Sequence, residues 1–103
     1  GGRQLDAAQS SIHTLFEIVE NYSEQIEIMM DSGLQSGPDV ARAIAAGAKF
    51  TFMGRSFLYG CSALGKDGGD HTITMLKTQF KQVMDQLCCD KVEDLPKHLI
   101  SPF

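Results

Sequence analysis

Residues 26–55 read IEIMMDSGLQSGPDVARAIAAGAKFTFMGR, and the order of patterns in these residues indicates the class of fold. The apolar run at 26–30 stops abruptly at Asp31-Ser32-Gly33, as a buried strand entering a tight turn does. A helix is expected over residues 37–46, because its second residue is proline, which the first turn of a helix tolerates. The apolar run at 49–53 predicts a second strand. Strand, helix and strand in this order are typical of a parallel βαβ unit.

Helical patterns flank this unit on both sides. Residues 10–22 carry apolar side chains at three- and four-residue spacing, which predicts an amphipathic helix. A helical pattern resumes over 56–59 and loosens around the next glycines, and the cluster Gly65, Gly68 and Gly69 predicts a loop. Residues 70–89 carry one apolar stripe and form the longest predicted helix, and a last short helix is expected over 92–100.

Two strands are too few for a complete domain of this kind. A parallel sheet needs both faces covered, and a (β/α)₈ barrel has eight strands over about 250 residues. The sequence therefore predicts an α/β fold, the C-terminal third of a (β/α)₈ TIM barrel, with about two parallel strands and four to five helices. Residues 1–103 would form one segment of a single barrel domain, incomplete as a barrel alone.

Composition excludes several classes of protein. The 103 residues are 43% hydrophobic and 21% charged, as in an ordinary globular domain or part of one. The formal net charge of -4 and the scattered basic residues argue against a nucleic-acid surface. The three cysteines form no spaced metal-binding pattern, so we expect free thiols and no metal site. No apolar stretch approaches the ~20 residues of a membrane helix.

Two consecutive strand ends carry groups suited to an anion. The loop 31–37 contains Gly33 and Gly37, whose backbone N–H groups could approach a ligand beside the N-terminus of the next helix. Taken alone, such a loop is more often a glycine-rich turn with a capping aspartate. The second strand ends in Gly54-Arg55, and a guanidinium offers a planar fork of donors for phosphate oxygens. The alternative for Arg55 is a surface salt bridge. In (β/α)₈ barrels the usual phosphate site lies at the loops after strands 7 and 8.

Three motifs in order resemble one enzyme family. Gly1-Gly2-Arg3-Gln4-Leu5-Asp6, Asp31-Ser32-Gly33-Leu34 and Gly54-Arg55-Ser56-Phe57-Leu58-Tyr59-Gly60 are similar to motifs of the FMN-dependent 2-hydroxy-acid oxidases and dehydrogenases. That family includes L-lactate dehydrogenase, lactate oxidase, glycolate oxidase and flavocytochrome b2. The resemblance covers nearly the whole chain, because residues 43–53 also resemble the passage before the family's phosphate arginine.

The resemblance implies a role for each matching residue. Arg3 would pair with the substrate carboxylate, and Asp31 would contact the ribityl chain of FMN. Gly33, Gly54 and Arg55 would hold the FMN phosphate. Gln35 stands where the family usually has a second phosphate-binding arginine, which implies weaker binding or an altered loop.

The family's catalytic histidine would come directly before Gly1, outside this chain. In the family this histidine takes a proton as the substrate passes a hydride equivalent to the flavin. The chain alone is therefore expected to be inactive.

The implied activity is oxidation of an L-2-hydroxy acid, of lactate or glycolate type, to the 2-oxo acid with FMN. We expect order only beside the remainder of the barrel, which could be a separate chain, and a homo-oligomer for the intact enzyme. Two alternatives stay open: another FMN- or phosphate-binding barrel, or a non-catalytic α/β module that binds a partner through residues 70–89. The ending Ser101-Pro102-Phe103 is no peroxisomal signal, which favours a cytoplasmic or membrane-peripheral location.

Overall fold

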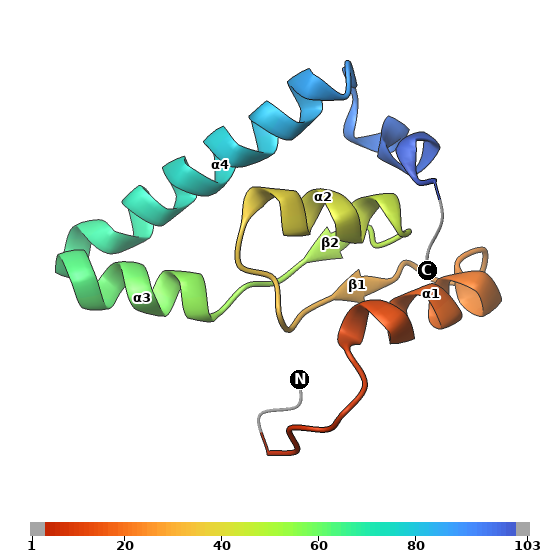
Figure 1. The fold of residues 1–103 in the computed structure, drawn as a ribbon, viewed down its shortest axis with the longest axis horizontal. Coiled ribbons are helices and arrows are strands. Elements are labelled where there is room, and N and C mark those ends of the chain that lie inside the picture. The colour runs from red at the N-terminus through yellow and green to blue at the C-terminus, as the bar shows by residue number, and fades with distance from the viewer. Residues whose placement is uncertain (1–3, 101–103) are drawn as a thin grey trace.

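A computed structural model of the chain describes residues 4–100. Arg3, the expected partner of the substrate carboxylate, lies outside these residues. Figure 1 shows the elements, which follow in chain order: α1 (Ser11–Tyr22), β1 (Met29–Met30), α2 (Gly37–Ala45), β2 (Phe50–Thr51), α3 (Arg55–Leu64), the 3₁₀ helix η1 (Gly65–Asp67), α4 (Gly68–Gln86) and the 3₁₀ helix η2 (Val92–His98).

The predicted βαβ unit is confirmed. Strands β1 and β2 pair in parallel, with Met29 opposite Phe50, and α2 crosses between them. Both strands are shorter than the predicted runs, because few backbone groups pair between them. Beyond the paired residues, hydrogen bonds between the two segments run from Lys49 N–H to the Ile28 carbonyl (2.7 Å) and from Phe52 N–H to the Met30 carbonyl (2.9 Å). Ile26 was expected in the first strand, but its N–H donates to Tyr22 at the end of α1.

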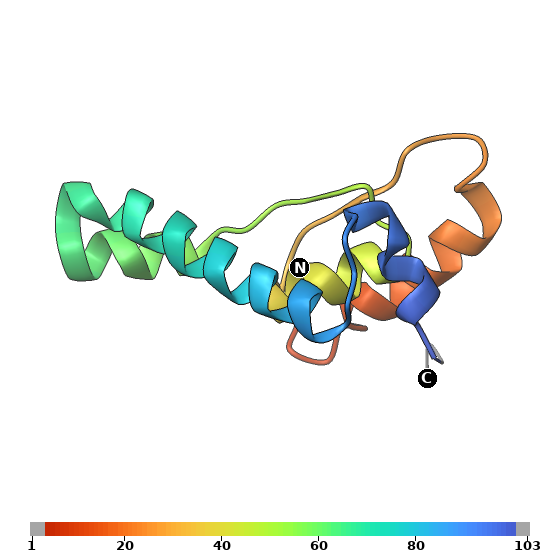
Figure 2. The same ribbon diagram turned by 90° about the horizontal axis from the view of Figure 1, so that it is seen from above.

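In the described part of the chain, helices cover one face of the two strands and leave the other bare. One apolar cluster joins α1, β1 and α2, and its buried members are Leu15, Ile28, Met30, Leu34, Ala43, Ala46 and Ala48. A second cluster joins α2 to α4 and η2 through Ala41, Met84, Cys89 and Leu95. Figure 2 shows α1, α2 and α4 together on one side of the strands.

The bare face of the sheet is apolar. Met29, Phe50 and Phe52 are 59%, 56% and 52% exposed, and the two phenylalanine rings meet edge to face with their centroids 5.1 Å apart. Residues at alternate positions of a strand point to opposite faces, so these three side chains share the face that no helix of residues 4–100 covers. A barrel interior is filled by such side chains, and the exposure therefore agrees with a piece of an α/β barrel.

The glycine cluster is not the predicted loop. Gly65 begins η1, while Gly68 and Gly69 form the first turn of α4, and α3 continues through Gly60. A Cβ on Gly68 would overlap the backbone of Gly60, so these glycines permit close contact between α3 and α4. The two helices form a hairpin whose turn lies away from the rest of the chain, while the C-terminal half of α4 packs on α2 (Figures 1 and 2).

The long C-terminal helix ends at Gln86, slightly before the prediction. Cys88 adopts the left-handed conformation (φ 53°), and the N–H groups of Cys88 and Cys89 donate to the carbonyls of Asp85 (3.1 Å) and Met84 (2.9 Å). This pattern is the Schellman motif that commonly ends a helix. Both cysteines therefore lie just beyond the helix. The predicted last helix is η2, a 3₁₀ helix that contains Pro96.

Within residues 4–100, no helix is both long enough and apolar enough to cross a bilayer. Among the same residues, no group of three or more His, Cys, Asp or Glu side chains could hold a metal ion.

Candidate functional site: an anion site at the strand ends

The carboxyl ends of β1 and β2 open on one cavity. Because the strands are parallel, the loops that follow them leave at the same edge of the sheet. They flank an open cavity of about 790 Å³. All five predicted cofactor residues within the described part of the chain line it: Asp31, Gly33, Gln35, Gly54 and Arg55.

The β1–α2 loop has an unusual backbone. Ser32 and Gly33 are both left-handed, with φ values of 77° and 80°. Two successive residues of this kind turn the chain sharply, and a Cβ on Gly33 would meet no atom within 4 Å. The Ser11 hydroxyl at the start of α1 fixes the turn by donating to the Ser32 carbonyl (2.9 Å). Gly33 therefore presents its backbone to open space in the cavity.

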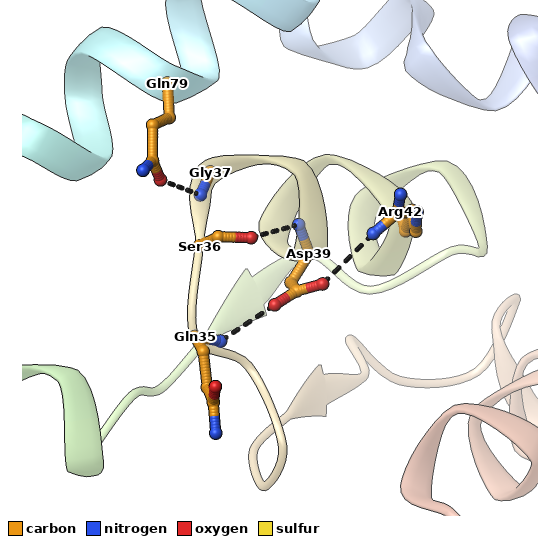
Figure 3. A network of polar contacts seen from close by, with 6 residues as sticks. All are labelled: Gln35, Ser36, Gly37, Asp39, Arg42 and Gln79. Carbon is orange, nitrogen blue, oxygen red and sulfur yellow. Dashed lines mark hydrogen bonds and ion pairs between the residues drawn. The ribbon is translucent and has the colours of Figure 1, made fainter.

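The N-terminus of α2 is closed to a ligand, which corrects one expectation. Gly37 N–H donates to Gln79 Oε1 on α4 (2.8 Å), and Asp39 N–H donates to Ser36 Oγ (3.4 Å). Gln35 N–H is also satisfied, by Asp39 Oδ2 at 3.0 Å (Figure 3). A Cβ on Gly37 would overlap the backbone of α4 at Phe80. Gly37 therefore allows α2 to pack on α4 and does not cradle an anion.

The N-terminus of α3, unlike that of α2, is open to a ligand. Gly54 is its N-cap and has no side chain to cap the helix, although the Gly54 carbonyl accepts from Leu58 N–H (3.1 Å). First-turn amides have no acceptor inside their own helix and carry the positive end of the helix dipole. A Cβ on Gly54 would meet nothing within 4 Å. The cavity therefore faces an uncapped helix start.

Arg55 is the first residue of α3 and lines the cavity. Its side chain is exposed, and it forms none of the ion pairs found within residues 4–100, which join Asp39 to Arg42, Lys81 to Asp85 and Asp94 to Lys97. The alternative of a surface salt bridge thus has no partner in this part of the chain. A free guanidinium beside an uncapped helix N-terminus suits a phosphate group.

Sequence reasoning missed the side chains that hold the loops. Ser11, Asp39 and Ser56 each bond to the backbone of the β1–α2 loop. One signal was present: Ser36 and Asp39 have the spacing of a capping box, in which a serine caps the helix and an acidic residue three positions later reaches back. No local pattern identifies Ser11 or Ser56, whose bonds span 21 residues.

Parallel strands joined by a crossover helix, with a cavity at their carboxyl ends, are typical of α/β barrel enzymes. The sequence profile of the FMN-dependent dehydrogenase family matches residues 1–102, and the chain belongs to this family. Its relatives are FMN-dependent enzymes that oxidise 2-hydroxy acids.

Individual relatives agree with this family. A peroxisomal (S)-2-hydroxyacid oxidase of Arabidopsis thaliana is 37% identical over 95% of this chain and 27% of its own length. Human 2-hydroxyacid oxidase 1 is 36% identical over 97% of this chain and 27% of its own length. Among solved structures, a soluble variant of the membrane-associated (S)-mandelate dehydrogenase of Pseudomonas putida is 36% identical, with a TM-score of 0.84 over 92% of this chain and 27% of that one. The chain thus spans about a quarter of the length of its relatives.

Proposed function

We propose that residues 1–103 form the C-terminal segment of an FMN-binding (β/α)₈ barrel that oxidises an L-2-hydroxy acid to the 2-oxo acid. The observation that carries the proposal is the convergence of Gly33, Gly54 and Arg55 on one cavity. FMN supplies the hydride acceptor when bound, and this segment supplies part of its anchorage. The remaining strands of the barrel would cover the bare face of β1 and β2.

Each residue has a proposed role at this corner of the active site. Arg55 pairs with the FMN phosphate, which also accepts from backbone N–H groups near Gly54 and Gly33. Asp31 is exposed in the same cavity, where its carboxylate can accept a hydrogen bond from a ribityl hydroxyl. Arg3 receives the substrate carboxylate in a bidentate pair, a role that rests on the Gly-Gly-Arg motif alone.

Anaerobic reduction of the bound flavin tests this function. The full-length protein should carry FMN whose absorbance bleaches with lactate, glycolate or a related 2-hydroxy acid. Arg3→Met should keep the flavin but slow bleaching by at least about 10-fold, because a lost charged hydrogen bond costs about 1.5–3 kcal/mol. A flavin indifferent to every 2-hydroxy acid would favour another FMN-binding barrel. A protein that binds no flavin or phosphate would favour the interaction module.

Gln35 offers a gain-of-affinity prediction. The charged residues that line the cavity within residues 4–100 are Asp31 and Arg55, so the cavity has no net positive charge to offset a phosphate dianion. Gln35→Arg should tighten FMN binding by roughly 10-fold, since hydrogen bonds from charged donors are about twice as strong as neutral ones. Titration of the apoprotein by flavin fluorescence measures this change.

Gln35→Met is the matched control for that gain, because it keeps the length of the side chain and removes its donors. It should weaken FMN binding by a few-fold. Equal FMN affinities of the Gln35→Arg variant and the original protein would show that the side chain at this position does not approach the phosphate.

The proposed enzyme works in a cytoplasmic or membrane-peripheral location as a homo-oligomer. Its relatives include proteins named as peroxisomal and as membrane-associated. Localisation of the tagged full-length protein and its mass in solution test these two points.

A further inference from the structure

We propose that Ser56 is a positioning residue. Its hydroxyl holds the backbone of Gln35 and so ties the β1–α2 loop to the start of α3, beside the proposed phosphate site. The Ser56 hydroxyl donates to the Gln35 carbonyl at 2.9 Å, across 21 residues of sequence. Ser56 is the second residue of α3 and directly follows Arg55. The bond therefore links the β1–α2 loop to the helix that presents the guanidinium. This role rests on the function proposed above.

Both backbone groups of Gln35 are fixed, each from a different helix. Its N–H donates to Asp39 Oδ2 on α2 (3.0 Å), and its carbonyl accepts from Ser56 on α3. Asp39 is itself held, because its other carboxylate oxygen pairs with Arg42 at 3.1 Å. Two such anchors restrict rotation of the peptide groups on both sides of the Gln35 Cα.

The anchored backbone directs the Gln35 side chain. Figure 3 shows this side chain pointing away from Asp39 and from α2, and Gln35 lines the cavity that Arg55 also lines. Its amide group can donate to an anion there. Without the Ser56 hydroxyl, the Gln35 carbonyl would have no hydrogen-bond partner among residues 4–100, and the β1–α2 loop would lose its direct bond to α3. Ser56 thus acts through Gln35.

Because the Ser56–Gln35 bond is exposed, its effect on FMN binding can be measured apart from any effect on the stability of the fold. The Ser56–Gln35 bond lies at the surface, whereas the apolar clusters that stabilise the fold lie behind the strands. Water can replace an exposed hydrogen bond at small cost to stability. Loss of the hydroxyl should therefore leave the unfolding temperature nearly unchanged and act on phosphate binding.

Comparison of FMN with riboflavin, which lacks the phosphate, tests the role in the full-length apoprotein. Ser56→Ala should weaken FMN binding by about 3- to 10-fold, the range expected for one hydrogen bond, and leave riboflavin binding unchanged. Ser56→Thr keeps the hydroxyl and should restore FMN affinity. Ser62→Ala removes an exposed hydroxyl elsewhere on α3 and serves as the matched control, with both affinities unchanged.

A double-mutant cycle tests whether Ser56 acts through Gln35. In a Gln35→Ala background, Ser56→Ala should weaken FMN binding no further. Three results would overturn the role of Ser56 while leaving the proposed function standing. These are additive losses in the double mutant, equal losses for FMN and riboflavin, and an unchanged FMN affinity in Ser56→Ala. An original protein that binds neither flavin would overturn the proposed function, and this role with it.

Discussion

Replacing Arg55 by leucine should lower FMN affinity by about 10- to 100-fold, which corresponds to the roughly 1.5–3 kcal/mol of a hydrogen bond to a charged group. Within residues 4–100, Arg55 is the only cation that lines the cavity at the strand ends, and its removal leaves Asp31 as the remaining charge there. Riboflavin affinity should not change. Fluorescence titration of the full-length apoprotein with both flavins measures the difference.

Two further variants separate charge from geometry at this position. Arg55→Lys keeps the positive charge but loses the planar fork, so its FMN affinity should lie between those of the original protein and Arg55→Leu. Lys66→Leu removes an exposed cation beyond the far end of α3 and should leave FMN affinity unaltered. If Arg55→Leu binds FMN as tightly as the original protein, the phosphate does not lie at the start of α3.

The central βαβ unit could be predicted because its signals are local. Apolar runs, a proline in the first turn of α2 and glycine at the turns all act over a few residues, and they specify parallel strands whose carboxyl ends meet. That geometry alone brings Asp31, Gly33, Gly54 and Arg55 to one cavity. The strand lengths could not be predicted, because they depend on which backbone groups find a neighbour.

The errors have a common cause in contacts between distant residues. Gly37 has the sequence context of an anion cradle, but its N–H is taken by Gln79, 42 residues later in the chain. The glycines at 65–69 have the composition of a loop, yet Gly68 lies against Gly60 of the preceding helix. A glycine needed for close packing looks the same in sequence as a glycine needed for a turn. Only the packing of α4 distinguishes the two uses.

Replacing Gly60 by alanine should destabilise the protein by about 1–3 kcal/mol, although alanine is the better helix former. A Cβ on Gly60 would overlap Thr72 Oγ1 and lie 2.9 Å from the Gly68 carbonyl oxygen. Thr72 has little room to move, because it is 1% exposed and its hydroxyl donates to Gly68 (2.8 Å). Denaturant unfolding of the full-length protein measures the loss.

Gly69→Ala is the matched control, because it makes the same change at a helical glycine whose Cβ would meet nothing within 4 Å. It should raise stability by up to about 1 kcal/mol. Gly60→Ala should also weaken FMN binding, since the added methyl group pushes α3 away from α4 and Arg55 begins α3. If Gly60→Ala instead stabilises the protein as Gly69→Ala does, the close contact between the two helices does not hold α3 in place, and the position of Arg55 does not depend on it.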